Sequence, residues 1–353
     1  MRKSGFTIDE RKNEVLAAIV KAHVTTGQPV GSFALARQSS ERLSSATMRN
    51  ICAELEEEGL LSHPHTSAGR IPTQQGYRYY VDHLMSSTML SPSERDLIND
   101  RLLDDEILQN PELMMERASQ LLSELSDNVG IVVPPAISQD RLHHIEFVKL
   151  PDKRVLVITA SNLGRVQDRL IRFDEDFSQN DLNTTARYLL ENFHGWSLAE
   201  IRDELLRRMT EEKALYDKLL RNAVVLCSQS LQDGDQPDVF IEGASSIITK
   251  PDFADVERMR VLFKMFEQKG RIVKMLNSCI AGARFDVATV RIGSENGLDL
   301  HDCAVIASPY FYGSGTASGS IGVVGPTRVD YDRVVSIVTY IANLFGRVLN
   351  ENI

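Results

Sequence analysis

Residues 44–73 have the sequence SSATMRNICAELEEEGLLSHPHTSAGRIPT, which predicts a helix, a stop and a short hairpin. Ser44 or Ser45 can cap the helix, because a serine hydroxyl accepts hydrogen bonds from free backbone N–H groups in the first turn. Gly59 favours a C-terminal cap. Four apolar side chains recur at spacings of three and four and so predict an inward face: Met48, Ile51, Cys52 and Leu55.

The opposite face of this predicted helix begins with four side chains, Ser45, Thr47, Arg49 and Asn50. All four carry hydrogen-bond donors that suit phosphates and base edges. The acidic side chains fall in the last two turns, so we expect the helix to enter a DNA groove by its N-terminus. The alternative is a polar face that is only solvated, because every amphipathic helix has one.

Beyond Gly59 the sequence predicts two short strands and a turn. Leu60–Ser62 is the first strand, Pro64–Gly69 the turn and Arg70–Ile71 the returning strand. We expect the Arg70 guanidinium to project from the turn toward a DNA groove or phosphate, and an arginine in solvent is the alternative. Three further side chains of the turn can contact the DNA backbone: His65, Thr66 and Ser67.

Upstream of Ser44 the sequence predicts two more helices. The second is short, from Phe33 to Gln38, and Ser32 at its start is a further candidate for DNA contact. The first ends near Gly27 and has one apolar face, formed by Val15, Leu16, Ile19, Val20 and His23. Three helices with a short turn between the second and third, followed by a hairpin, predict a winged helix-turn-helix.

Several stretches closely resemble the HrcA family of heat-inducible transcription repressors. They are SSATMRN, EEEGLL, PHTSAGRIPT, GYRYYVD (Gly76–Asp82), EIRDELL (Glu200–Leu206), IGSEN (Ile292–Asn296) and GSIGVVGPTRVDYDRV (Gly319–Val334). The resemblance covers essentially the whole chain. Two positions depart from it, because Phe33 stands where relatives usually carry a basic residue and Ile51 where they usually carry an acidic one.

The resemblance implies a non-enzymatic repressor of heat-shock chaperone operons. It would bind the CIRCE operator, an inverted repeat in double-stranded DNA, as a homodimer, and would depend on the GroEL chaperonin for its active state. The candidate DNA-binding residues are Ser32, Ser44, Ser45, Thr47, Arg49, Asn50, His65, Thr66, Ser67 and Arg70.

Composition and charge fit a cytoplasmic protein of two or three domains. The chain has 353 residues, of which 42% are hydrophobic and 25% charged. We expect no signal peptide, because the N-terminal MRKSGF is too short and polar for one, and no apolar run comes near the roughly 20 residues of a membrane-spanning helix. The four cysteines are far apart in sequence, which indicates reduced thiols and neither disulfides nor a zinc site.

The net charge of −10 argues against a general nucleic-acid binder. Residues 1–85 hold 10 Lys or Arg and 9 Asp or Glu, so the acidic excess lies in the rest of the chain. A nearly neutral DNA-binding part attracts DNA only weakly without base contacts. We therefore expect its affinity to depend on dimerisation and base reading.

The sequence predicts an α+β protein whose second domain is interrupted by helices. Strands are predicted before residue 174 and after 236, and helices at 178–194, 197–209 and 211–231. The resemblance implies that residues 1–88 are a winged domain with a linker helix, that 93–173 and 237–353 form one GAF-like domain, and that 174–236 are an inserted dimerisation segment. We expect residues 86–92 to be the only tie between the winged domain and the rest.

The predicted helices of residues 178–231 carry more apolar surface than they can bury among themselves. Trp196 is the only tryptophan of the chain and suits an interface anchor. The candidate dimerisation residues are Leu189, Phe193, Trp196, Leu198, Ile201 and Leu205.

No motif predicts catalysis, a cofactor or a metal site. The glycine-rich loop 313–319 lacks the spacing of a phosphate cradle, and His63 and His65 have no further ligands nearby. Arg328, Asp330 and Asp332 suit the start of the last helix, and a structural role suffices for them. The alternative function is a regulator that senses a small molecule through its GAF-like domain, which would need an open polar pocket there.

Overall fold

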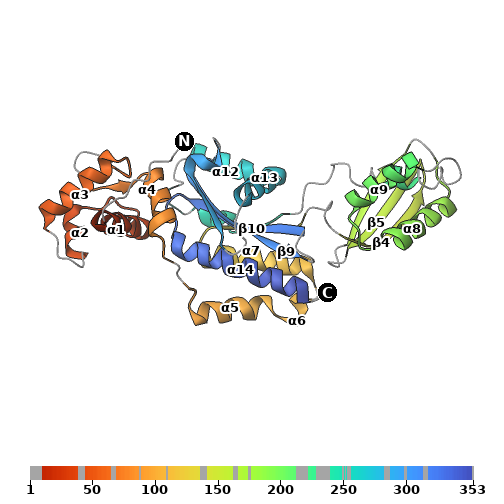
Figure 1. Ribbon diagram of the computed structural model, residues 1–353, viewed down its shortest axis with the longest axis horizontal. Coiled ribbons are helices and arrows are strands. Elements are labelled where there is room, and N and C mark those ends of the chain that lie inside the picture. Colours follow the sequence, from red (N-terminus) through yellow and green to blue (C-terminus); the bar gives the residue numbers. More distant parts are fainter. Residues whose placement is uncertain are drawn as a thin grey trace.

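The computed structural model describes residues 10–38, 44–64, 69–86, 89–108, 110–135, 141–161, 166–173, 176–211, 222–227, 239–248, 250, 252, 256–281, 287–297, 300–312 and 317–351. These form three structural units in a row (Figure 1). We call residues 10–86 the head, residues 89–135 with 239–351 the body, and residues 141–227 the insertion. Of the helices in these ranges, none has the length and apolar character that crossing a membrane requires.

The head has the predicted order of three helices and a hairpin. Its elements are α1 (Glu10–Thr26), α2 (Ser32–Gln38), α3 (Ser45–Glu57), β1 (Leu61–Ser62) and β2 (Ile71–Pro72). The two strands pair antiparallel, with Leu61 opposite Pro72. The predicted inward faces of α1 and α3 are confirmed, because Leu16, Ile19 and Leu55 are completely buried in one core.

A fourth helix closes the head. It comprises α4 (Gln74–Tyr79) and a π-helical turn, η1 (Tyr80–Leu84). The Thr73 hydroxyl accepts a hydrogen bond from Gly76 N–H at 3.0 Å and donates one to the Gly59 carbonyl at 2.7 Å. Gly76 lies so close to β1 that an added Cβ would be 2.1 Å from the Leu60 carbonyl oxygen. Residue 76 must therefore be glycine for α4 to pack where it does.

The body is built on a five-stranded antiparallel sheet. The strand order is β7 (Phe240–Glu242), β3 (Val129–Val133), β10 (Ala317–Pro326), β9 (Cys303–Tyr312) and β8 (Thr289–Ile292). One face packs against α7 (Pro111–Ser126) and α14 (Tyr331–Glu351), and the other against α12 (Val256–Glu267) and α13 (Lys269–Ile280). Shorter helices complete it: α5 (Pro92–Leu102), α6 (Asp105–Leu108), α11 (Ala244–Ile248) and η4 (Gly293–Asn296).

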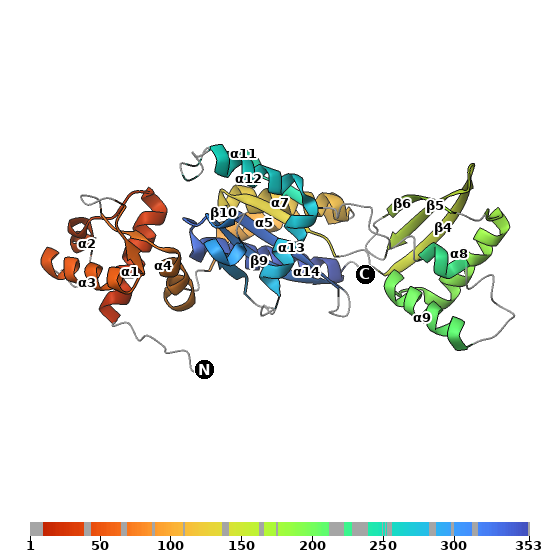
Figure 2. The ribbon, with the colours of Figure 1, turned by 90° about the horizontal axis from the view of Figure 1, so that it is seen from above.

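The insertion is a separate unit with its own sheet. Strands β4 (Leu142–Leu150), β5 (Arg154–Ser161) and β6 (Val166–Arg172) pair only with one another among the described strands. Helices α8 (Gln179–Phe193) and α9 (Leu198–Glu211) cover one face of this sheet (Figure 2). The predicted domain boundary between 173 and 174 therefore cuts through one hydrophobic core, because β4–β6 belong with the helices and not with the body.

Five of the six candidate dimerisation residues are internal core. Leu189, Phe193, Leu198, Ile201 and Leu205 are buried against the insertion's own sheet. The expectation that they form an exposed interface is wrong, because the three strands supply the surface that the helices alone lack. Trp196 stays 41% exposed, with its ring edge-on to Phe193 at a centroid distance of 5.6 Å.

The head is docked directly on the body. Tyr77 and Tyr80 are both buried and belong to one continuous core with α14 of the body. Arg78 Nη1 also donates to the Val290 carbonyl at 2.8 Å, and Gln74 Nε2 to the His301 carbonyl at 2.8 Å. The expectation that residues 86–92 are the only tie is therefore wrong, because the tyrosine face of the fourth helix packs on the body as well as on the head.

We predict that Gly76→Ala lowers the free energy of unfolding of the head by about 1–3 kcal/mol, because the new methyl group overlaps a backbone carbonyl. Gly270→Ala is the matched control, since Gly270 also lies near the start of a helix but has open space where Cβ would be. Alanine there should be neutral or slightly stabilising. Thermal unfolding followed by circular dichroism measures both, and equal transitions for the two variants would contradict the predicted clash.

Candidate nucleic-acid interface

The start of α3 is capped by a side chain. Ser44 has extended backbone angles, and its Oγ accepts a hydrogen bond from Thr47 N–H at 3.1 Å. The Ser44 and Thr47 hydroxyl oxygens are also 2.9 Å apart and share a hydrogen bond. The predicted cap is confirmed for Ser44, and it fixes the direction in which the first turn of the helix leaves the head.

The exposed face of α3 begins with hydrogen-bond donors. Thr47, Arg49 and Asn50 are exposed and Ser45 is half-buried. The predicted inward face is buried throughout: Met48, Ile51, Cys52 and Leu55. Ile51 is therefore a packing residue of the head, and burial raises the pKa of the Cys52 thiol.

The acidic end of α3 is partly neutralised. Lys12 of α1 binds Glu54 at 2.7 Å and Glu58 at 2.9 Å. Gly59, at a φ of +76°, donates to the Glu56 carbonyl, and Leu60 N–H donates to the Leu55 carbonyl at 2.9 Å. These two backbone bonds form a Schellman cap, so the predicted stop at Gly59 is confirmed.

The hairpin after α3 is joined to the loop before α2. Arg70 and Val30 exchange two backbone hydrogen bonds, at 2.8 and 2.9 Å. An added Cβ on Gly69 would lie 2.4 Å from the Val30 carbonyl, so this close approach requires glycine. The base of the hairpin is therefore fixed relative to α2 and α3.

Arg70 does not project from the turn as the sequence predicted. Its Nη2 lies 3.2 Å from Glu56 Oε2, and the side chain is only 21% exposed. The guanidinium folds back because the bridge to Val30 places Arg70 beside the acidic end of α3. It holds the hairpin against α3, and any DNA contact would require the pair with Glu56 to open.

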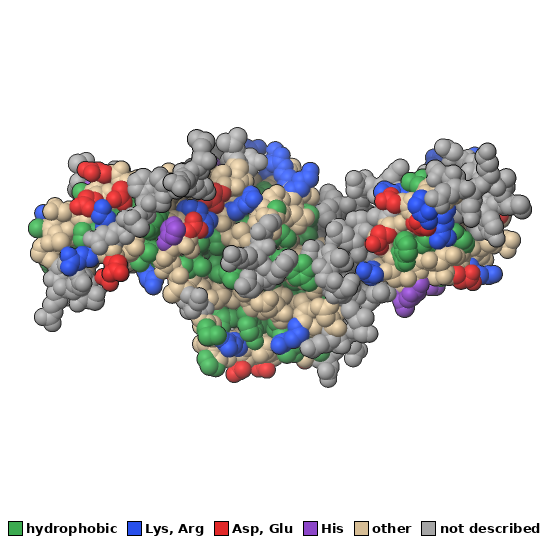
Figure 3. Space-filling model, viewed as in Figure 1, with side chains coloured by type: hydrophobic (Ala, Val, Ile, Leu, Met, Phe, Trp, Pro, Cys, Tyr) green, Lys and Arg blue, Asp and Glu red, His purple; other side chains and the backbone are tan. Residues whose placement is uncertain are grey.

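The remaining candidate residues are placed only in part. Ser32 is half-buried at the start of α2, and the side chain of Phe33 next to it is 69% exposed. His65, Thr66 and Ser67 lie outside the described residues. Lys and Arg side chains alternate with Asp and Glu on the face of the head seen in Figure 3, without a single basic patch.

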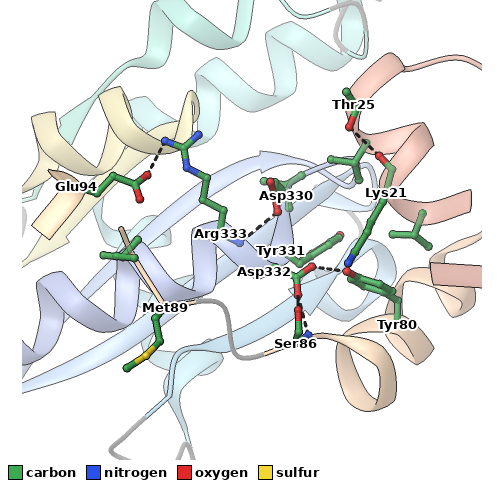
Figure 4. Close-up of a pocket in the computed structure, with 14 residues that line it drawn as sticks. Lys21, Thr25, Tyr80, Ser86, Met89, Glu94, Asp330, Tyr331, Asp332 and Arg333 are labelled. Atoms are coloured by element: carbon green, nitrogen blue, oxygen red, sulfur yellow. Dashed lines mark hydrogen bonds and ion pairs between the residues drawn. The ribbon is translucent and has the colours of Figure 1, made fainter. Parts of the chain in front are cut away.

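A cavity of about 400 Å³ lies at the junction of head and body (Figure 4). Its walls come from α1, from η1, from the residues at and just before the start of α5, and from the start of α14. They include Lys21, Tyr80, Met89 and Asp330. By contrast, Val305, Ile306 and Val323 in the body's sheet are buried and apolar, and Ser308 and Ser320 of the same strands are buried as well.

Arg328 and Asp332 contact the head, which no pattern in the sequence predicts. Arg328 lies just before α14 and Asp332 lies in its first turn. Arg328 Nη1 donates to the Val24 carbonyl of α1 at 2.8 Å, and Asp332 accepts from Ser86 N–H at 2.8 Å. Asp330 and Asp332 both lie at the start of α14 as expected, and Asp330 accepts a hydrogen bond from Arg333 N–H at 3.2 Å. No local pattern could have indicated partners so distant in sequence.

Residues 112–335 match the family model described as the C-terminal domain of the HrcA protein. The chain is 42% identical over 343 residues to the heat-inducible transcription repressor HrcA of Geobacter sulfurreducens, covering 97% of this chain and 98% of that protein. The chain belongs to the HrcA family. It is also 35% identical to the HrcA repressor of Syntrophobacter fumaroxidans, across 98% of both chains. The family comprises transcription repressors and not enzymes.

One solved structure shares the fold. It is the crystal structure at 2.2 Å resolution of a chain described only as a hypothetical protein. The TM-score is 0.60 at 22% sequence identity, with 98% of this chain and 100% of that chain covered. The arrangement of head, body and insertion therefore has a counterpart among solved proteins.

Proposed function

We propose that this chain is a cytoplasmic, homodimeric repressor that binds the CIRCE inverted repeat upstream of heat-shock chaperone operons. Membership of the HrcA family supports the regulatory role, and the exposed donor face of α3 supports DNA reading. We further infer that the head is a winged helix-turn-helix and that the body is GAF-like. Each of two heads would occupy one half-site of the repeat.

The first two turns of α3 are the proposed base-reading surface. Thr47, Arg49 and Asn50 are exposed there, while the acidic residues at the other end bind Lys12 and Arg70. An arginine that reaches a base edge can make two hydrogen bonds to one guanine. Ser32, Ser44 and Ser45 lie near the same end of the head and would contact the DNA backbone, as would the turn residues His65, Thr66 and Ser67.

The proposed dimer surface is the uncovered face of the insertion's sheet. We call it the outer sheet face. Its apolar members are Val148, Leu150, Leu156, Ile158, Ala160, Val166 and Leu170, and the charged residues Glu146, Arg154, Asp168 and Arg172 lie beside them on the same face. Val148, Leu156 and Leu170 are in register across the three strands. Val166 is 65% exposed and Leu170 53% exposed, although both are aliphatic. An apolar row of this kind on a solvated sheet is typical of a protein interface, and Trp196 could extend it.

The proposed dependence on chaperonin also follows from the apolar outer sheet face. When the dimer dissociates, the outer sheet face would be open to solvent. Exposed apolar surface promotes aggregation, and chaperonins bind such surfaces. We therefore infer that heat removes the active dimer and that GroEL restores it.

Replacing Arg49 should selectively weaken operator binding. We predict that Arg49→Ala costs about 1–3 kcal/mol on a CIRCE duplex and much less on a scrambled duplex. Arg101→Ala is the matched control, because Arg101 is an exposed arginine on α5 of the body. Gel-shift titrations at one salt concentration measure the six affinities of the wild-type chain and the two variants on the two duplexes. Equal losses on both duplexes would instead assign Arg49 to a phosphate.

Replacing Leu170 should dissociate the dimer. A carboxylate in the middle of an apolar interface remains without a partner, so Leu170→Asp should give a monomer with weak operator binding. Leu206→Asp is the control, since Leu206 is 46% exposed on α9, away from the outer sheet face. Sedimentation velocity gives the mass of each variant. A Leu170→Asp protein that stays dimeric would exclude this face as the interface.

Mild heating should abolish operator binding through dissociation or aggregation, before the head unfolds. Chaperonin with ATP should then restore binding without joining the DNA complex. Light scattering and operator binding, followed together on one sample through a temperature ramp, test both steps. The mechanism is wrong if binding disappears while the protein stays dimeric and returns on cooling without chaperonin.

A further inference from the structure

Three of the sequence stretches quoted above meet at the junction of head and body. GYRYYVD forms much of the fourth helix of the head, IGSEN forms the end of β8 with η4, and GPTRVDYDRV leads into α14. We propose that Arg328 and Asp332 are positioning residues for DNA binding. They fix the direction of each head on the body, and so set the half-site spacing that a dimer accepts. This inference rests on the proposed function.

Arg328 holds the C-terminal end of α1. Its Nη1 donates to the Val24 carbonyl, and its Nε and Nη2 donate to the two carboxylate oxygens of Asp252 at 3.0 and 2.6 Å. The guanidinium also packs against Gly27, which has a φ of +67° where α1 ends. One body side chain therefore binds a helix end in the head while a second body residue keeps it in place.

Asp332 holds the last helical turn of the head. It accepts hydrogen bonds from the Tyr80 hydroxyl, from Ser86 N–H at 2.8 Å and from the Ser86 hydroxyl at 3.1 Å (Figure 4). Burial and the Asp332 carboxylate raise the pKa of Tyr80, so its hydroxyl remains a donor at neutral pH. Asp332 thus binds both η1 and Ser86, the last residue of the head.

Both positioning residues are close to a buried aromatic pair, because Arg328 lies near Tyr77 and Asp332 follows Tyr331 in α14. The Tyr77 ring of the head and the Tyr331 ring of the body have centroids 5.7 Å apart. His23 Nδ1 is 2.8 Å from the Tyr77 hydroxyl, and burial together with the nearby Arg328 charge lowers the pKa of His23. Restraint at the end of α1 and at the end of the fourth helix, together with this packed pair, opposes rotation of the head relative to the body.

The dependence of affinity on the spacing between half-sites is a direct measure of how firmly the heads are held. Each base pair inserted between half-sites rotates one of them by about 35° around the helix axis, because one turn takes roughly 10–10.5 base pairs. Two rigidly held heads tolerate little of that rotation, whereas loosely held heads follow it. Loss of the positioning contacts should therefore reduce the discrimination between spacings more than it reduces affinity at the native spacing.

The test uses the full chain with Arg328→Gln, Asp332→Asn and the double variant. Arg333→Gln is the matched control, because Arg333 is adjacent in sequence but binds Glu94 within the body, at 3.1 Å. Affinities are measured on CIRCE duplexes whose spacer is shortened or lengthened one base pair at a time. The affinity ratio between the best and worst spacings should fall about fivefold or more in the positioning variants and stay unchanged in the control.

An unchanged spacing profile in folded, dimeric positioning variants would overturn the inference. Tighter binding at the native spacing would also overturn it, because the junction would then restrain the head in a non-binding direction. Wild-type protein that does not distinguish CIRCE from scrambled DNA would contradict the proposed function instead.

A second measurement does not depend on DNA. Spin labels at Glu57→Cys on α3 and Asn343→Cys on α14 occupy exposed positions, whereas all four native cysteines are buried. Their distance distribution should be narrow in the otherwise wild-type chain and in the Arg333→Gln control, and broad in the positioning variants. Equally narrow distributions in all of them would overturn the inference, whatever the DNA result.

Discussion

The Tyr77 ring of the head packs on the Tyr331 ring of the body, and both side chains are almost completely buried. This contact joins the core of the head to the core around α14. Because side chains in such a core are closely packed, the head and the body cannot rotate independently without losing apolar contacts. The donor face of α3 is therefore presented in one direction relative to the body, which is what a dimer needs to read two half-sites at once.

The insertion is a separate unit with one covered and one uncovered sheet face. Its helices are buried on one face of β4–β6, so it has a core of its own and projects from the body as a separate unit. The same three strands leave an apolar row on their other face. Dimerisation through that face would leave both heads free for DNA. Temperature would then act mainly on an interface at a distance from the DNA-reading surface.

Local features of the fold were predictable from the sequence, because each is fixed by neighbours along the chain. The cap at Ser44, the stop at Gly59 and the buried stripe of α14 follow from residue type and spacing. Helix α13 was missed, although Ile272, Leu276 and Cys279 repeat at helical spacing and are buried. The separation of β4–β6 from the five-stranded sheet of the body could not be predicted, because alternating apolar residues predict a strand but not the strand with which it pairs. The positions of Arg328 and Asp332 at the start of α14 were predictable. Their contacts with the head were not, and Arg70 was misplaced, because these partners depend on tertiary contacts.

Hydroxyl-radical footprinting of the full-length protein on a CIRCE duplex tests the central claim most directly. That claim is that a dimer with two fixed heads reads the inverted repeat. It predicts two protected tracts of equal strength, related by the two-fold axis of the repeat and appearing together as protein is added. A single protected tract, or two tracts that fill at different protein concentrations, would contradict it.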